Sequence, residues 1–274
     1  MFCTELFANL AVRKRTEKNM TYGICKLSTI PVRKESRHGS EMVSQLLYNE
    51  TYMVLDKTHE WVLIRFENGQ STLQTDSETA AGDSAYYQGW IQAKQFCEIS
   101  EEEYNALKTK PVYLINKPIA EFQGKFLSLG TPLYEPHPDA VETPTEFHPE
   151  MMVEYAKLLL GAPYLWGGRC AMGIDCSGLT QVCARLCGLL LPRDANQQIA
   201  CGDLVYFLQE TQPGDLAFFG DEDGRITHVG IVMDGEQSSH ASGEVRIDVL
   251  DQTGIFNKDK NEHTHRLQAI KRLR

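Results

Sequence analysis

One cysteine has the residue type and the sequence setting that nucleophilic catalysis needs. Cys176 lies in the tetrapeptide DCSG, after a loop with a Gly-Gly pair and directly before a segment with helical apolar spacing. The sequence therefore predicts a thiol at a helix N-terminus, where unpaired N–H groups and the helix dipole favour negative charge. Such a setting can lower a thiol pKa and can supply an oxyanion hole. We interpret Cys176 as the nucleophile.

Two histidines follow in segments that alternate like strands. His228 lies in THVGIVM and His240 in SHAS. A three-residue hairpin loop over 233–235 would pair the two directly on one sheet face, whereas a two-residue turn would put them on opposite faces. In the first case His228 is the base and His240 orients its ring. Otherwise His228 is a hydrogen-bonded core residue.

The elements that must position these residues form a mixed helix and strand pattern. A helix is predicted over 151–160, ended by Gly161 and Pro163. PGDLAFFG, THVGIVM and EVRIDVL read as strands, which together with the helices indicates an α+β domain. A second helix begins at Cys176 and runs up to Pro192, with its apolar stripe formed by Leu179, Val182, Cys183, Leu186 and Leu190.

The chain ahead of that domain is rich in predicted strands. We expect residues 1–19 to be an N-terminal extension, with disorder as one expectation for it, and residues 20–105 to be a β domain. Residues 106–146 contain short apolar runs punctuated by Pro and Gly, which indicates a second small β module running into a linker. Residues 147–274 are the predicted catalytic domain.

Composition limits the partners and the compartment. The 274 residues carry a formal net charge of −10, which repels phosphate backbones and disfavours nucleic acid as a partner. No apolar run reaches the roughly 18 residues of a membrane span, so no membrane partner is expected. The basic cluster 13–15 follows an apolar patch, the reverse of a secretory signal. We expect a cytoplasmic protein, or a periplasmic or secreted one only if a signal has been removed.

We expect the eight cysteines to be reduced thiols and not disulfides. They include no Cys-x-x-Cys pair and no common zinc spacing, and no secretory signal argues for disulfides. A thiol and an imidazole suffice for peptide hydrolysis. We therefore expect no cofactor and no metal.

The motif set resembles one enzyme family. YLWGG, DCSG, PGDLAFF, THVGI and SHAS, in this order, are similar to the NlpC-type papain-like cell-wall cysteine peptidases, and the resemblance covers 147–274. Gly89-Trp90-Ile91 is similar to a segment of bacterial SH3-like domains. The resemblance implies an α+β fold in which a papain-like NlpC-type catalytic domain is preceded by one full and one reduced all-β SH3-like module.

The whole chain resembles the γ-D-glutamyl-L-diamino acid endopeptidases, also called dipeptidyl-peptidase VI. These cleave after L-Ala-γ-D-Glu in muropeptides with a free amine, and the resemblance implies that Glu41 and Tyr87, with Tyr86 as the alternative, receive that ammonium. Ala195 stands where close relatives usually carry Ser. The catalytic-domain pocket residues that the resemblance implies are Tyr164, Trp166, Asp175, Ser177, Arg193 and Asp194.

These observations predict a cysteine peptidase acting on peptidoglycan-derived peptides in recycling or remodelling. Cys176 would form the acyl-enzyme, and His228 would later protonate the leaving amine. Two alternatives stay open: a general cell-wall endopeptidase or amidase of the same fold, and a non-enzymatic wall-binding module.

Overall fold

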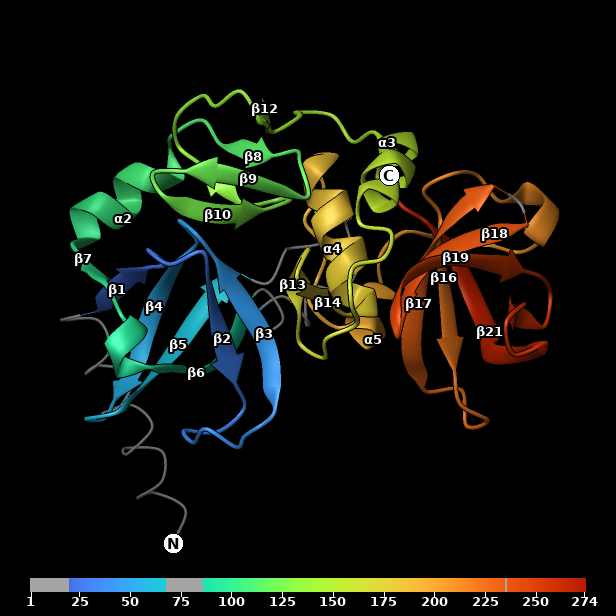
Figure 1. The fold of residues 1–274 in the computed structure, drawn as a ribbon, viewed down its shortest axis with the longest axis horizontal. Coiled ribbons are helices and arrows are strands. Elements are labelled where there is room, and N and C mark those ends of the chain that lie inside the picture. The colour runs from blue at the N-terminus through green and yellow to red at the C-terminus, as the bar shows by residue number, and fades with distance from the viewer. Residues whose placement is uncertain (1–19, 68–85, 235) are drawn as a thin grey trace, which may run out of the picture.

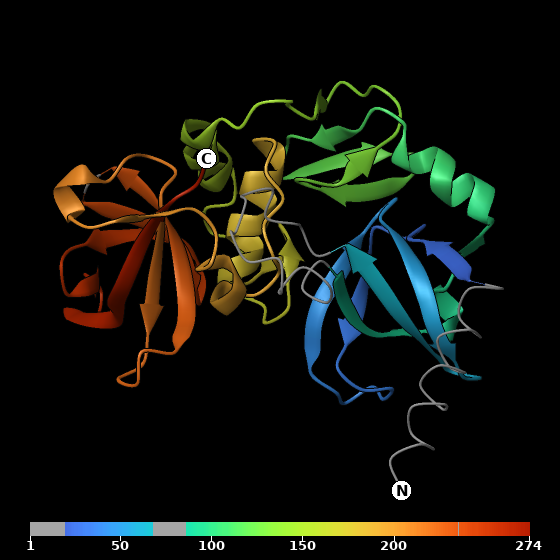
Figure 2. The ribbon, with the colours of Figure 1, turned by 180° about the vertical axis from the view of Figure 1, so that it is seen from behind.

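The computed structural model describes residues 20–67, 86–234 and 236–274. The expected N-terminal extension, 1–19, lies outside them. A β-rich N-terminal region and a C-terminal sheet stand on either side of the central helix α4 (Cys176–Leu186), and a smaller β region lies above the first (Figure 1). The same three groups are seen from behind in Figure 2. None of the helices in these ranges is both long and apolar enough to cross a membrane.

The N-terminal sheet has the order β3-β2-β6-β5-β4-β1-β7. Its alternating buried residues, such as Ile30, Val32, Val62 and Ile64, fill one core. Helix α2 (Glu101–Lys108) follows it, capped by the Ser100 side chain, so the β pattern ends before residue 105. The strands are β1 (Thr21–Ile24), β2 (Thr29–Arg33), β3 (Met42–Leu47), β4 (Thr51–Lys57), β5 (Trp61–Glu67), β6 (Tyr86–Gln92) and β7 (Glu98–Ile99), with a 3-10 turn at Ala93–Gln95.

The middle region consists of two small sheets, ordered β10-β9 and β11-β8-β12. Their core of Ile115, Leu127 and Leu133 also contains Tyr48 from the N-terminal region. This shared core joins the two β regions. The strands are β8 (Tyr113–Ile115), β9 (Ile119–Phe122), β10 (Lys125–Ser128), β11 (Pro132–Leu133) and β12 (Ala140–Glu142).

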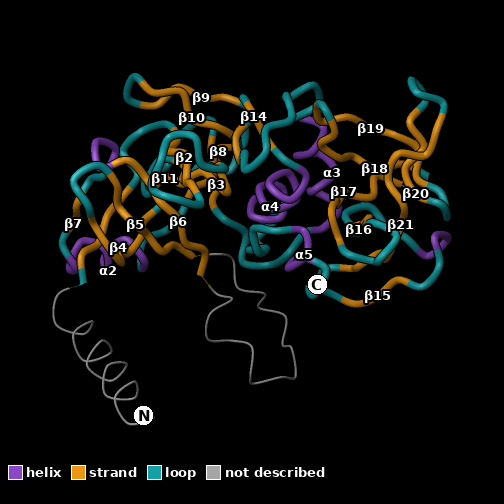
Figure 3. The backbone as a smooth tube through the Cα atoms, turned by 90° about the horizontal axis from the view of Figure 1, so that it is seen from below, coloured by secondary structure: helices purple, strands orange, loops and turns teal. Residues whose placement is uncertain are grey.

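The C-terminal region packs helices against a sheet of order β15-β21-β16-β17-β18-β19-β20, and pairing of β20 with β21 closes that sheet on itself. Seen from below, α4 lies between this sheet and the N-terminal strands (Figure 3). The elements are α3 (Pro149–Leu158), β13 (Arg169–Cys170), β14 (Gly173–Ile174), α5 (Ala195–Gln198), β15 (Asp203–Val205), a 3-10 turn (Leu208–Glu210), β16 (Leu216–Gly220), β17 (Ile226–Asp234), β18 (Gln237–Ser242), β19 (Glu244–Leu250), β20 (Gly254–Asn257) and β21 (Glu262–Arg272).

The predicted helices exist, but their ends differ from the prediction. The first begins at Pro149, whose missing N–H costs nothing at a helix start. Helix α4 ends at Leu186 instead of running up to Pro192. Gly188 has φ +92°, a left-handed conformation that ends the helix and turns the chain. The apolar residue Leu190 therefore continues the periodic pattern without being helical.

A buried charge cluster joins the N-terminal region to the C-terminal region. Glu50, between β3 and β4, accepts from Arg169 at 2.9 and 3.0 Å and from Arg185 at 2.6 Å. Burial by itself would raise the pKa of Glu50, but the two guanidinium groups lower that pKa to about 2. Arg169 also donates to the backbone carbonyl of Gln45 at 2.7 Å. The two regions are thus held together by charges that lie away from solvent.

We predict that Glu50→Gln lowers the free energy of unfolding by roughly 3–5 kcal/mol, because it leaves two buried guanidinium groups without a counter-charge. The pKa of about 2 lies below the ordinary value of 4.5, so the wild-type stabilisation is complete above pH 4.5 and is lost as pH falls towards 2. Urea unfolding at several pH values measures both effects.

The matched control is Glu154→Gln, which removes an exposed carboxylate 2.8 Å from Lys157. Its effect should stay below about 1 kcal/mol. Equal effects of the two substitutions would contradict the structural role given to Glu50.

Candidate active site

Cys176 is the first residue of α4, as its sequence setting predicts. Its predecessor Asp175 caps the helix, and Asp175 Oδ1 accepts from the Gly178 N–H at 2.7 Å. A side chain at Gly178 would meet the carbonyl oxygen of Gly168 at 2.2 Å, so this turn needs glycine. Burial raises the pKa of the Cys176 thiol, and the nearby backbone N–H groups of Val229 and Ser177 oppose that rise, which places the sulfur near β17 directly after His228.

The Asp175 carboxylate is occupied by donors from this chain. Arg193 donates to its two oxygens at 3.0 and 2.6 Å, and the Gly167 N–H donates to Oδ2 at 2.8 Å. The Ser177 hydroxyl donates to Oδ1 at 3.3 Å and accepts from Arg193 at 2.9 Å. These three side chains therefore position the start of α4. Their predicted contacts with substrate stay predictions.

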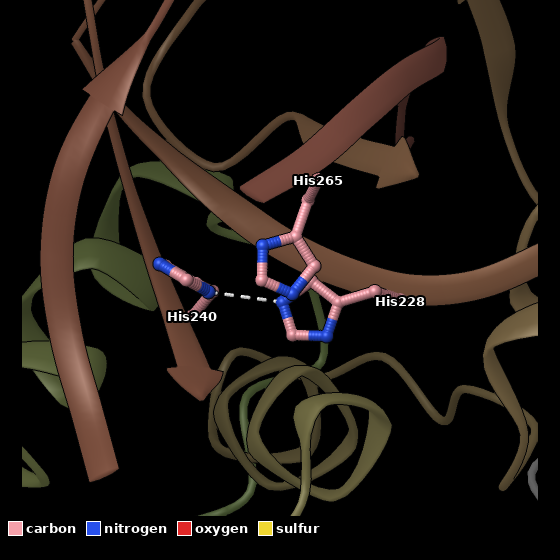
Figure 4. Close-up of side chains that lie close together, drawn as sticks. All are labelled: His228, His240 and His265. Carbon is pink, nitrogen blue, oxygen red and sulfur yellow. Dashed lines mark hydrogen bonds between the residues drawn. The ribbon is translucent and has the colours of Figure 1, made fainter. Parts of the chain in front are cut away.

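The two predicted histidines meet next to this helix start. His228 Nε2 and His240 Nδ1 are 2.9 Å apart, and both rings are buried (Figure 4). The contact occupies Nε2 of His228, so Nδ1 is the His228 nitrogen that His240 does not engage. The predicted contact between His228 and His240 is therefore present, and the roles of Cys176 as nucleophile and His228 as base stay predictions.

The predicted strand register was wrong, although its consequence holds. His240 pairs with Gly230 and not with His228, and the last pair is Asp234 with Gln237. The loop over 233–235 is therefore not the predicted three-residue hairpin. An irregularity between Val232 and Asp234 compensates the shorter turn. The register moves by two residues, which keeps both histidines on one face because side chains alternate with period two.

His265, on β21, was missed by the sequence reasoning. Its ring stacks on that of His228 with centroids 4.2 Å apart and planes at 28° (Figure 4). Nitrogens of His228, His240 and His265 lie within 4.8 Å of one another, close enough to consider a metal. A metal needs lone pairs that converge on one point. The stacked rings of His228 and His265 hold their lone pairs in nearly parallel planes, where they do not converge. The three histidines are therefore better suited to hydrogen bonding and packing than to holding a metal.

The pKa shifts of Cys176 and His228 differ from the expectation that a helix N-terminus lowers the pKa of a thiol. Burial, followed by the charge of Asp175, raises the pKa of the Cys176 thiol to about 12. Burial, followed by the neighbouring His265 and His240, lowers the pKa of His228 well below its ordinary value. A preformed thiolate–imidazolium pair needs the opposite order of pKa values. Both shifts favour a neutral thiol and a neutral imidazole over a preformed ion pair.

Two carboxylates each form a hydrogen bond across the junction between the regions, Glu41 with Trp166 and Asp194 with Tyr87. Glu41, directly before β3, accepts from Trp166 Nε1 at 2.8 Å and lies 3.4 Å from Lys34 Nζ. Tyr87 donates to Asp194 Oδ1 at 3.3 Å, and burial, opposed by the charge of Arg193, raises the pKa of Asp194, with a further contribution from the charge of Glu41.

Tyr87 contacts Asp194 of the C-terminal region, whereas the Tyr86 ring lies 5.7 Å from the guanidinium of Arg65 in its own sheet. Trp166 is 58% exposed and so can form an open wall of a pocket. Burial raises the pKa of Tyr164 to about 12, and the Cys176 and Asp175 charges add to this, which places Tyr164 near the nucleophile. Ala195 is buried at the start of α5 and offers no hydroxyl there.

The Gly-Gly pair allows the loop before Cys176 to pass the N-terminal region closely. Gly167 has φ +78°, and a side chain there would meet the carbonyl oxygen of Met42 at 2.4 Å. Met42 follows Glu41 directly. The close approach therefore sets the distance between Glu41 and Trp166.

Comparison with known proteins agrees with this geometry. Residues 161–263 match the NlpC/P60 family. This segment is an NlpC/P60 domain. Over 232 residues the chain is 28% identical to a γ-D-glutamyl-L-lysine dipeptidyl-peptidase of Bacillus subtilis, covering 72% of this chain and 71% of that protein. A protein of the same name from Bacillus cereus is 24% identical over 250 residues, covering 78% and 71%.

The fold of the whole chain has a solved counterpart. An NlpC/P60 family protein from Bacillus cereus superposes with a TM-score of 0.71 at 19% identity, covering 92% of this chain and 99% of that one. The similarity extends over the β-rich N-terminal region as well as the NlpC/P60 domain. The arrangement of these regions is therefore a shared fold.

We predict that the alkylation rate of Cys176 by iodoacetamide rises steeply towards alkaline pH, because burial raises the thiol pKa to about 12. Peptide mapping over a pH series measures the alkylation rate of Cys176. The difference in ultraviolet absorbance between wild type and Cys176→Ser measures how much of the Cys176 thiol is ionised. A thiolate signal with a rate plateau around neutral pH would show a preformed ion pair instead.

We predict that His228→Ala abolishes turnover, whereas His240→Ala leaves a reduced but measurable rate, because an orienting residue is partly dispensable. The exposed His59 provides the control, and His59→Ala should retain the wild-type rate. Initial rates on a muropeptide decide this. Near-wild-type rates for both active-site variants would contradict the assigned roles.

Proposed function

We propose that this chain is a cysteine peptidase that hydrolyses the γ-D-Glu–L-diamino acid bond of muropeptides with a free N-terminal L-Ala, releasing L-Ala-γ-D-Glu. The observation that carries the proposal is the contact of Glu41, from the N-terminal region, with Trp166 in the loop before Cys176. It joins a carboxylate of the N-terminal region to the loop that leads to Cys176. The names of the similar Bacillus proteins support the same reaction.

The reaction needs only groups that the site contains. The Cys176 sulfur attacks the γ-carbonyl carbon of D-Glu while its proton passes to Nδ1 of His228. N–H groups at the start of α4 stabilise the oxyanion. The C–N bond then breaks, the leaving amine takes the proton from His228, and a thioester remains. Water then attacks that thioester while His228 takes its proton, the C–S bond breaks, and the Cys176 sulfur regains the proton from His228 as the dipeptide leaves.

An acidic wall fits the ammonium of the substrate. Glu41 and Asp194 are close enough for their charges to interact, and a cation between them would stabilise both. Lys34 now contacts Glu41, but this pair is exposed, with side chains 66% and 41% accessible, and such pairs contribute little. A substrate ammonium can therefore replace Lys34. The aromatic rings of Trp166 and Tyr87 border the same wall.

Within this proposal the N-terminal regions are SH3-like modules that select substrate. An enzyme that requires a free L-Ala amine cannot use intact wall peptide, in which that amine is linked to sugar. The proposal therefore includes a role in recycling released muropeptides, in the cytoplasm. Lys and diaminopimelate are both compatible with the leaving position.

We predict that the wild-type enzyme cleaves L-Ala-γ-D-Glu-L-Lys and ignores its N-acetylated form, because an acetylated amine would leave the carboxylate of Glu41 without its cation. Glu41→Gln should lower the rate on the free-amine peptide far more than the already poor rate on the acetylated one. Initial rates of both enzymes on both peptides, with mass detection of the dipeptide, measure this.

Glu35→Gln is the matched control, since Glu35 lies in the same turn, is exposed and contacts Arg37 at 2.6 Å. It should leave both rates unchanged. If wild type cleaves both peptides alike, the chain is a general wall endopeptidase or amidase. If it cleaves neither but binds peptidoglycan, the binding-module alternative holds.

A further inference from the structure

A buried carboxylate lies behind the orienting histidine, on the side away from His228. Asp248, on β19, accepts from His240 Nε2 at 3.1 Å, and its side chain is 3% exposed. The β18–β19 register pairs His240 with Arg246, so Asp248 reaches His240 diagonally from the same sheet face. In Figure 4 one nitrogen of His240 faces His228 and the other points away from it. Both nitrogens of His240 are thus engaged.

Asp248 is held ionised. Burial by itself would raise the pKa of Asp248, but hydrogen bonds from His240 and Arg246 lower it. Arg246 donates Nε to Oδ2 at 2.7 Å and Nη2 to Oδ1 at 3.0 Å, a two-point contact that fixes the carboxylate plane. Arg246 also contacts Asp259 at 2.7 Å. An ionised carboxylate can only accept hydrogen bonds.

The consequence passes through both rings. Because Asp248 only accepts, His240 must carry its proton on Nε2, and its Nδ1 is then an acceptor in the neutral ring. His228 must therefore donate from Nε2, which leaves the lone pair of His228 on Nδ1. That nitrogen is the one not engaged by His240.

We propose that Asp248 is a positioning residue that fixes the tautomers of His240 and His228 and so makes Nδ1 of His228 the base. The site is then a chain of four residues, Cys176, His228, His240 and Asp248. Without the carboxylate, His240 can carry its proton on Nδ1 and donate to His228. His228 then holds its own proton on Nδ1, where it cannot accept one from the thiol. His265, stacked on His228, holds the ring plane while the tautomer is set.

The proposal rests on the proposed peptidase chemistry, but its first test needs no substrate. Proton–nitrogen NMR of the imidazoles in the full chain carrying Cys176→Ser should show His228 and His240 both protonated on Nε2. A proton on Nδ1 of either ring would overturn the proposal, whatever the enzyme cleaves. Failure to cleave muropeptides, with the expected tautomers present, would count against the function alone.

The second test compares two substitutions. Asp248→Leu has similar volume and no acceptor, so kcat should fall roughly 100-fold, the lower end of what a general base contributes. KM should stay unchanged, and the NMR signals should report the other tautomers. Asp248→Asn keeps an acceptor facing His240, so its tautomers should stay as in wild type and its kcat within a few-fold.

The control is Asp259→Asn, which changes an exposed carboxylate that contacts the same Arg246 at 2.7 Å. It should match wild type in kcat and in tautomers. A folded Asp248→Leu with wild-type kcat, or one with reduced kcat and unchanged tautomers, would refute the proposal. If Asp248→Leu does not fold, the test rests on Asp248→Asn. A 100-fold loss of kcat in Asp248→Asn, with the tautomers of wild type, would also refute the proposal.

Discussion

The carboxylate of Asp175 is the interaction on which the rest of the site depends. It caps α4 through Gly178, holds the loop through Gly167 and pairs with the buried guanidinium of Arg193. Arg193 is 2% exposed and in turn donates to Ser44 of the N-terminal sheet at 3.3 Å. One buried charge therefore connects the nucleophile, the pocket loop and the neighbouring β region. Loss of the Asp175 carboxylate would leave the buried guanidinium of Arg193 without its counter-charge and helix α4 without its N-cap.

Local sequence predicted the centre of the site because the determinants are local. A capping Asp before Cys176 and the apolar period after it define a helix start without any distant contact. His228 and His240 were placed on one face by counting, and an error of two residues in register did no harm because the period of a strand is two. An error of one residue would have separated them.

The partners contributed by distant strands were harder to predict. Asp248 is one of three charged residues in EVRIDVL, and strand alternation puts it on the same face as Glu244 and Arg246, so no local pattern marks it as buried. His265 meets His228 because β21 pairs with β16, which in turn pairs with β17. That order depends on closure of the whole sheet, which no local pattern specifies. The thiol pKa was misjudged for the same reason, since burial is a property of the assembled fold.

The Glu50 cluster has a consequence for how such proteins can diverge by exchange of modules. Its carboxylate comes from the N-terminal region and its two guanidinium groups, those of Arg169 and Arg185, come from the C-terminal region. Neither region by itself neutralises the charges that it buries at the junction. A recombination event that brought in a different N-terminal module without an acid at this place would bury two cations together. Viable recombinants must carry compensating changes at residues 169 and 185. We therefore expect these three positions to be inherited as a unit, and the two regions to evolve as one protein.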